Sequence, residues 1–276
     1  MSKTIYIFFY PIIALLFFGS CSSKQKDAKS YLSAAREFYQ SGNYESAKLQ
    51  IDSIKIKFPK AFDEIKEGHK LMQQIRTSEN QRNIAYCDSM LQVTHAAIEK
   101  TMLSFSLQKD PQYQETGNYI PKLTPLNQSF TRNTLRSGVS EDGKIYLESI
   151  VVGQNIGHRQ IRASLQDGSY AETLPVTSDG LNYSFNTIEG RYEIVKYTGK
   201  DENGVSNFIS VYKNEPITIQ CIGRKTISFS LSKNEKEAIS QSCELSSLLL
   251  ERERLKMEKG KSETLLRYLQ KKAGEE

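Results

Sequence analysis

Histidine is the side chain best suited to bind a metal or transfer a proton near neutral pH, and this 276-residue chain has three, His69, His95 and His158. None belongs to an HExxH segment or lies at another short spacing typical of metal ligands, so no metal site is predicted. His69 and His95 fall within predicted helices. His158 follows Gly157 in a predicted turn, where it is a candidate ligand-binding residue.

Two serines stand three residues before a lysine, Ser210 in SVYK and Ser230 in SLSK. In serine acyl-enzymes this spacing brings the amine to the hydroxyl only at the start of a helix, whereas both copies fall in predicted strands. The segment GQNIG at 153–157 lacks the third glycine of a dinucleotide-binding turn, and the chain has no GxxxxGK(S/T) motif. We therefore expect a non-enzymatic protein without a cofactor, although side chains from distant strands could still combine into a catalytic site.

Aromatic residues recur in two predicted strands, at Tyr183 and Phe185 in NYSFNTI and at Tyr192 and Tyr197 in RYEIVKY. Aromatic faces suit sugars, so these four residues join His158 as candidates for ligand binding. Aromatic side chains in strands also serve as core residues or cross-strand pairs. The sequence leaves both interpretations open.

Charge is spread along the chain, whose formal net charge is +5. The most basic segment, ERERLKMEKGK at 251–261, is interrupted by Glu251, Glu253 and Glu258, which is typical of a solvated helix face. A nucleic-acid-binding protein gathers its basic residues into a patch, so no nucleic-acid partner is predicted.

The N-terminus has the pattern of a secretory signal. Lys3 precedes an apolar run over residues 5–18, about fourteen residues, whereas roughly twenty are needed to span a bilayer. Two small residues follow, and then Cys21. We expect residues 1–20 to be a signal peptide.

The segment FGSC at 18–21 resembles the lipobox of bacterial lipoproteins. The resemblance implies cleavage before Cys21, lipidation of its thiol and an acylated amino group, so that N-terminal acyl chains hold the protein on a membrane. Ser22 is not the aspartate that signals inner-membrane retention in some lipoproteins, so the analogy favours the outer membrane of the bacterial cell envelope, facing the periplasm. Residues 21–27 are then a short tether. The alternative is an ordinary secretory signal followed by an incidental Cys21.

Residues 28–60 show two helical periods separated by Gly42-Asn43, which predicts a helical hairpin. Their order resembles one tetratricopeptide (TPR) repeat, with matching residue types at Tyr31, Ala34, Ala35, Phe38, Gly42, Asn43, Tyr44, Ala47, Ile51, Ile54 and Pro59. The resemblance implies a TPR-like helical hairpin at 28–60. About three repeats are needed for an independent array, so a packing role and a binding role both stay open.

Residues 61–105 and 233–276 each predict a long helix in which apolar stretches flank a polar gap. The first has the 3-4 apolar spacing of a coiled coil, at Ile84, Cys87, Leu91, Thr94, Ile98, Thr101 and Phe105. If the helices run antiparallel with paired residue numbers summing to about 338, the gap at 76–83 meets the gap at 255–262. This predicts a two-helix stalk of about 60 Å. It also places Cys87 about 12 Å along the axis from Cys243, too far for a disulfide.

Between these helices, residues 106–232 contain short alternating runs separated by turn signals such as Asp-Gly and Asn-Gly. The runs are KIYLESIVV, RQIRASLQ, AETLPV, NYSFNTI, RYEIVKY, SNFISVY, ITIQCIG and TISFSLS. They predict an antiparallel β-sandwich or barrel inserted between the stalk helices. The expected fold class is therefore α+β.

These features favour a membrane-anchored envelope lipoprotein, a non-enzymatic scaffold that presents a β-domain on a helical stalk to a protein partner. The alternative is an envelope glycan-binding module or enzyme whose cleft lies on the β-domain. A polar-lined cleft would mark a ligand site, and an exposed apolar patch would mark a protein contact.

Overall fold

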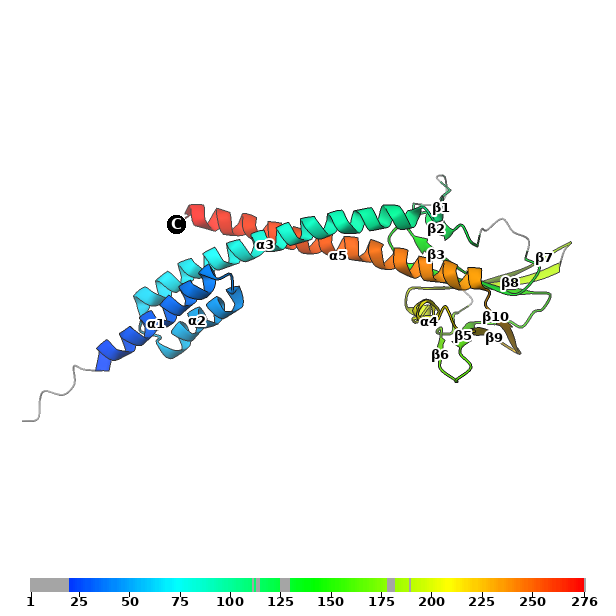
Figure 1. Ribbon diagram of the computed structural model, residues 1–276, viewed down its shortest axis with the longest axis horizontal. Helices are drawn as coiled ribbons and strands as arrows, with labels where there is room; N and C mark the ends of the chain where they lie inside the picture. Colours follow the sequence, from blue (N-terminus) through cyan, green and yellow to red (C-terminus); the bar gives the residue numbers. More distant parts are fainter. Residues whose placement is uncertain are drawn as a thin grey trace, which may run out of the picture. The chain divides into compact units, whose positions relative to one another are not determined.

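The computed structural model describes residues 20–110, 112, 115–124, 130–177, 182–188 and 190–275, with side chains described between Asp27 and Ala273. Within these residues the chain has five α-helices and two antiparallel sheets, which confirms the predicted mixture of helix and antiparallel sheet (Figure 1). Apart from Ser20, the predicted signal peptide at 1–20 lies outside the described residues.

The helices are α1 (Ser20–Gln40), α2 (Tyr44–Lys57), α3 (Phe62–Met102), α4 (Val205–Val211) and α5 (Lys233–Glu275), with a 3-10 turn at Gly199–Asp201. Sheet A has the strand order β1-β2-β3-β4-β8-β7, with bounds β1 (Phe105–Gln108), β2 (Asn118–Pro121), β3 (Thr134–Ser140), β4 (Ile145–Val152), β7 (Asn182–Thr187) and β8 (Gly190–Thr198). Sheet B has the order β10-β9-β5-β6, with bounds β5 (Gln160–Ser164), β6 (Tyr170–Glu172), β9 (Thr218–Ile222) and β10 (Thr226–Ser230).

The chain divides into two compact units. Unit 1 contains the described residues up to Tyr86 together with those from Glu258 onward, and unit 2 is Cys87–Met257. Helices α3 and α5 each run through both units.

Unit 1 contains α1 and α2, which are joined by a short turn. Gly42, at a φ of +74°, turns the chain between α1 and α2, and Asn43 caps α2 by accepting a hydrogen bond from the backbone N–H of Ser46. Helices α1, α2 and α3 share one apolar cluster, whose buried members are Ala28, Leu32, Ala35, Ala47, Ile51, Ile54, Leu71, Met72 and Ile75.

Helix α1 begins before the hairpin predicted at 28–60. Its backbone includes residues 21–27, where the sequence analysis expects a tether. No glycine or proline occurs between Ser20 and Gln40, and the lysine, glutamine and alanine residues of this stretch have high helix propensity. These residues therefore continue the helix instead of forming a separate linker.

The two sheets of unit 2 share one apolar cluster. Its members come from sheet A (Leu135, Leu147, Val151, Val195 and Tyr197) and from sheet B (Ile161, Ala163, Ile219 and Cys221). Helix α4 adds Val205 and Ile209, and α5 adds Ile239. Burial of this shared apolar surface is the main free-energy term that holds the sheets together.

Helix α5 is part of the same unit well beyond its first turn. The hydroxyl groups of Ser242 and Ser137 of β3 are both buried and lie 2.8 Å apart. A second cluster joins α3, sheet A and α5 through Ile98, Phe105, Val139, Leu245 and Leu249. The compact unit thus extends on both sides of the β-domain predicted at 106–232.

One predicted strand is wrong. Residues 206–212, SNFISVY, lie in α4 and the turn that follows it. The apolar residues Val205, Phe208, Ile209 and Tyr212 follow helical spacing, and the carboxylate of Glu202 accepts hydrogen bonds from N–H groups at the helix start. The segment was predicted as a strand because it was counted among the short alternating runs, but its apolar residues follow the helical period.

The register of α3 against α5 also differs from the prediction. In unit 1 the Asn83 amide donates to Ser262 Oγ at 2.9 Å, and in unit 2 Thr101 Oγ1 lies 3.4 Å from Glu244 Oε1. Both pairs of residue numbers sum to 345, seven more than the 338 predicted. A shift of one heptad returns each helix to the same face, so the apolar period cannot distinguish the two registers. Cys87, Cys221 and Cys243, all in unit 2, are free thiols.

Candidate functional site

Three of the four aromatic candidates form a row on one face of sheet A. Phe185 and Tyr192 are directly opposed on β7 and β8, with ring centroids 5.2 Å apart, and Tyr183 stacks on Phe185 at 6.0 Å. Phe130 extends the row with an edge contact to Tyr192 at 6.1 Å. Tyr183 is 50% exposed and Phe185 38%, so the β7 end of the row is open to solvent.

Tyr197, the fourth aromatic candidate, is not part of this row. It lies on the opposite face of β8, fully buried in the apolar cluster between the sheets, and burial raises the pKa of its hydroxyl. Alternate residues of a strand face opposite sides of the sheet, and Tyr192 and Tyr197 are separated by an odd number of positions. Tyr197 is therefore a core residue.

His158, the remaining candidate, lies in a buried polar network. Its Nε2 is 2.6 Å from Ser149 Oγ on β4, and its Nδ1 contacts the carboxylate of Glu193 on β8. A carboxylate only accepts hydrogen bonds, so Nδ1 carries a proton and donates it. Each of the three residues, Ser149, His158 and Glu193, is at most 5% exposed.

Glu193 also holds the loop between β4 and β5. Its carboxylate accepts hydrogen bonds from the backbone N–H groups of Ile156 and Gly157 at 3.0 Å and of His158 at 2.6 Å. Burial alone would raise the pKa of this carboxyl, but the hydrogen bonds from His158 and Gly157 outweigh it and lower the pKa to about 2. Glu193 is therefore an ionised, fully hydrogen-bonded anchor for the loop.

Ser149, His158 and Glu193 occur in the order of a nucleophile, a base and an orienting carboxylate. Ser149 is 0% exposed and faces the apolar cluster, so a substrate has no route to its hydroxyl. The network satisfies buried polar groups and positions the loop, as the hydrogen bonds to Glu193 indicate.

A polar cleft opens beside this loop. It has a volume of about 370 Å³ and is lined by residues from β7, β8, the β4–β5 loop and the β9–β10 turn, including Asn155, Gly157, Arg159, Tyr183, Ser184 and Arg224. His158 and Glu193 are also among its lining residues. Two of the five candidate residues, His158 and Tyr183, thus border one cleft.

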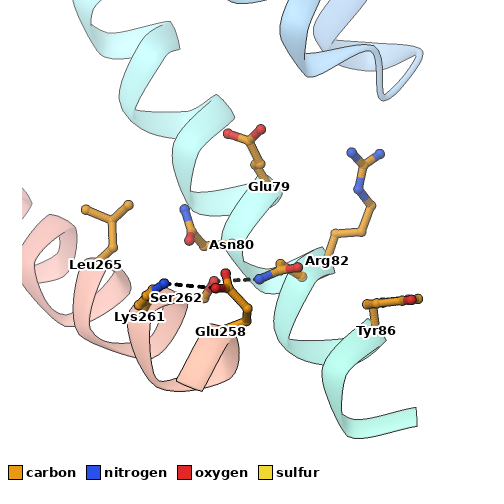
Figure 2. A pocket seen from close by; sticks show the side chains of 9 residues that line it. Glu79, Asn80, Arg82, Tyr86, Glu258, Lys261, Ser262 and Leu265 are labelled. Atoms are coloured by element: carbon orange, nitrogen blue, oxygen red, sulfur yellow. Dashed lines mark hydrogen bonds and ion pairs between the residues drawn. The ribbon is translucent and has the colours of Figure 1, made fainter. Parts of the chain in front are cut away.

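A second groove, of about 730 Å³, lies between α3 and α5 in unit 1 and is shown in Figure 2. Its charged residues are already paired. Glu79 accepts a hydrogen bond from Lys48, and Arg82 donates to the carbonyl of Gly42 while it stacks on Tyr44. The groove corresponds to the polar gaps of the two helices, and these contacts give it a structural role.

Asn83→Ala is expected to lower the free energy of unfolding by about 1–2 kcal/mol, because it leaves the Ser262 hydroxyl, 5% exposed, without its partner. Chemical unfolding followed by circular dichroism measures this loss. Asn80→Ala is the control, since Asn80 bonds only to the carbonyl of Arg76 in its own helix, and it should change stability by less than about 0.5 kcal/mol. Equal losses in both variants would contradict a pairing role for Asn83.

No family model, curated protein or solved structure matches this chain. Across the residues that the structure describes, no group of three or more His, Cys, Asp or Glu side chains is arranged to hold a metal ion. Over the same residues, no helix combines the length and apolar character needed to cross a membrane.

Sequence reasoning missed Ser149 and Glu193 as partners of His158, and Arg224 as a lining residue of the same cleft. The sequence held one signal for Glu193. It stands at alternate positions of β8 with Val195 and Tyr197, so it points to the same inward face of the sheet. A carboxylate on an inward face needs a buried partner, and this need points to a histidine. Arg224 left no comparable signal, because a turn arginine is ordinarily solvated.

Proposed function

We propose that this chain is a lipid-anchored, non-enzymatic protein of the bacterial cell envelope, in which α3 and α5 form an antiparallel stalk that presents a β-sandwich to a protein partner. One observation carries the proposal. Helix α3 leads into β1 and α5 follows β10, so both chain connections to the two sheets pass through helices of 41 and 43 residues.

The individual parts of the proposal have separate support. The sandwich is supported by the apolar cluster to which both sheets contribute, and the stalk by the common register of the Asn83–Ser262 and Thr101–Glu244 contacts. The TPR-like hairpin is supported by α1 and α2, whose turn falls at Gly42. The lipid anchor is supported by FGSC at 18–21, and its place in the outer membrane by Ser22.

The non-enzymatic assignment has a specific structural argument. Ser149 and His158 are the described residues that come nearest to a nucleophile and its base, and Ser149 is 0% exposed and does not line the cleft. A catalytic serine must reach the substrate carbonyl, so this arrangement fits a structural network.

Cys21→Ser is expected to move most of the protein from the membrane fraction to the soluble fraction, because the thiol that would carry diacylglycerol is lost. Mass spectrometry of the native mature N-terminus should find a triacylated Cys21 as its first residue. Ser23→Ala, two residues away, is the control and should remain with the membrane. An unmodified Cys21, or cleavage elsewhere, would remove the anchor from the proposal.

A partner is tested by gentle cross-linking in the intact envelope followed by detergent solubilisation and capture of this chain. The same envelope protein should be recovered in repeated experiments, and less of it from the Cys21→Ser strain. Repeated recovery of this chain alone would count against a scaffold role.

A glycan-binding module is the second candidate, and the row of Tyr183, Phe185 and Tyr192 beside a polar cleft favours it. On the same sheet face, Arg136, Glu148 and Lys196 are cross-strand neighbours, so charged groups adjoin the aromatic rings. Titration of envelope glycans against the full chain, with Tyr183→Ala as the variant, separates this candidate from the scaffold. Saturable binding that Tyr183→Ala weakens would favour the glycan module.

A further inference from the structure

The cleft between the β4–β5 loop, β7 and the β9–β10 turn has an unbalanced charge. Arg159 and Arg224 line it, and Glu193 is the one carboxylate among its lining residues. That carboxylate already accepts hydrogen bonds from three backbone N–H groups and from the His158 ring. Its charge is therefore compensated before any ligand enters, and the two guanidinium groups are left as the effective charges of the cleft.

Within the part of the chain that the structure describes, the side chain of Arg224 makes one hydrogen bond. Its Nη2 donates to the carbonyl of Asn155 at 3.0 Å, and its Cζ lies 3.7 Å from where a Cβ of Gly157 would be. Among the described residues no hydrogen bond is made by its Nε or Nη1. A guanidinium with free N–H groups in a planar fork is the arrangement that recognises carboxylate and phosphate oxygens.

The turn that carries Arg224 is fastened directly to the β4–β5 loop. The backbone N–H of Arg224 donates to the carbonyl of Ile156 at 2.7 Å, and that of Arg159 donates to the carbonyl of Ile222 at 3.1 Å. The approach is so close that a Cβ on Gly223 would lie 2.4 Å from the Ile156 carbonyl oxygen. The turn and the loop therefore behave as one rigid wall.

The buried network sets the position of this wall. Ser149 and Glu193 stand on adjacent strands of sheet A and hold His158, and Glu193 holds the loop through three amides. The loop in turn holds the turn that bears Arg224. Binding to a preorganised cation costs less ordering entropy than binding to a mobile surface arginine.

We propose that this cleft binds an oxyanion group, a carboxylate or a phosphate, on Arg224, with Arg159 as the second cation. The volume of about 370 Å³ accommodates one monosaccharide-sized acid, and Tyr183 at its rim offers an aromatic edge to the rest of such a ligand. This inference goes beyond the proposed scaffold function and does not depend on the lipid anchor.

The test uses the detergent-solubilised full chain with glucuronate and inorganic phosphate as probes at constant ionic strength, and glucose as a neutral probe. Calorimetry should detect saturable binding of at least one anion, and Arg224→Ala should weaken it at least tenfold. Lys225→Ala, which removes an exposed cation from the same turn, should change the affinity less than twofold.

The two anion probes distinguish the sources of the oxyanion. Binding of glucuronate alone identifies a carboxylated ligand, and binding of phosphate alone identifies a phosphorylated one. The proposal would be overturned if neither anion bound saturably with a dissociation constant below about 10 mM. It would also be overturned if Arg224→Ala and Lys225→Ala lost the same affinity. Binding of glucose as tight as that of glucuronate would be the third contrary result.

Discussion

Replacing Glu193 with alanine is expected to lower the free energy of unfolding by about 3–5 kcal/mol, the range for removing one partner of a buried charged pair. The substitution leaves the Nδ1–H of His158 and the backbone N–H groups of Ile156, Gly157 and His158 without an acceptor in a buried site. Each unsatisfied donor has a desolvation cost that the native carboxylate removes. Urea unfolding of the full chain, monitored by a signal from the sheets, measures the loss.

The stabilisation by Glu193 should also depend on pH. The pKa of this carboxyl is lowered in the folded protein to about 2 from an ordinary value of 4.5. A group whose pKa is lowered by folding stabilises the fold above its unfolded pKa, and the stabilisation is lost as the pH falls through the folded value. The difference in the free energy of unfolding between the native chain and Glu193→Ala should therefore be largest above about pH 4.5. It should become smaller as the pH falls toward 2.

Glu172→Ala is the matched control for this prediction. Glu172 also belongs to a sheet and pairs with Arg162 at 2.7 Å, but both side chains are about one third exposed. Exposed ion pairs contribute less than about 1 kcal/mol, so this variant should be nearly as stable as the native chain. A similar loss in both variants, or a Glu193→Ala chain of native stability, would show that the network does not support the loop.

The sheets could be predicted from the sequence wherever alternation was joined to a turn signal. The run that became β10 alternates cleanly, and Gly143 in the turn before β4 and Gly190 at the start of β8 have a positive φ. The strands β1, β2 and β3 were not predicted, since β1 and β2 have four residues each and β3 contains Gly138. That glycine weakens the strand pattern, and the ring of Tyr146 packs where its side chain would be.

The aromatic row was within reach of sequence reasoning, and the polar network was not. Tyr183, Phe185 and Tyr192 belong to one β-hairpin, so local register places them on a common face. Ser149 and Glu193 come together because β4 pairs with β8, across a chain segment that contains β5, β6 and β7. Such long-range pairing depends on the global packing of the sheets, which alternation in single strands does not encode.

The helix register illustrates a different limit. Apolar residues repeat with the heptad in both α3 and α5, so registers one heptad apart bury nearly the same stripes. In the predicted register Asn83 would face Leu255, which is buried in the structure, and its amide would lose its hydrogen-bond partner. A single part-buried polar pair thus favours one of two registers that hydrophobicity leaves nearly equal.

Ile239→Ala is expected to lower the free energy of unfolding of unit 2 by about 2–5 kcal/mol, the range for removing a fully buried isoleucine. Ile239 is on α5 but lies 0% exposed in the apolar cluster that both sheets share, so its truncation leaves a cavity among strands distant in sequence. Denaturant unfolding with a probe in the sheets measures the loss. Met257→Ala, on the same helix at 57% exposure, should change stability by no more than about 0.5 kcal/mol.

The same packing decides which fragment carries a folded β-domain. A fragment of residues 106–232 lacks Ile239 and the Ser242 hydroxyl that pairs with Ser137, and it also loses the Leu245 and Leu249 contacts to Val139. Because the inward face of β3 is exposed in this fragment, we expect it not to unfold cooperatively. A fragment of residues 87–257 retains these contacts and should unfold cooperatively. Cooperative unfolding of 106–232 at native stability would mean that α5 is attached to the sheets without supporting them. In that case the long helices would only hold the sheets in place, and Ile239→Ala would hardly change the free energy of unfolding.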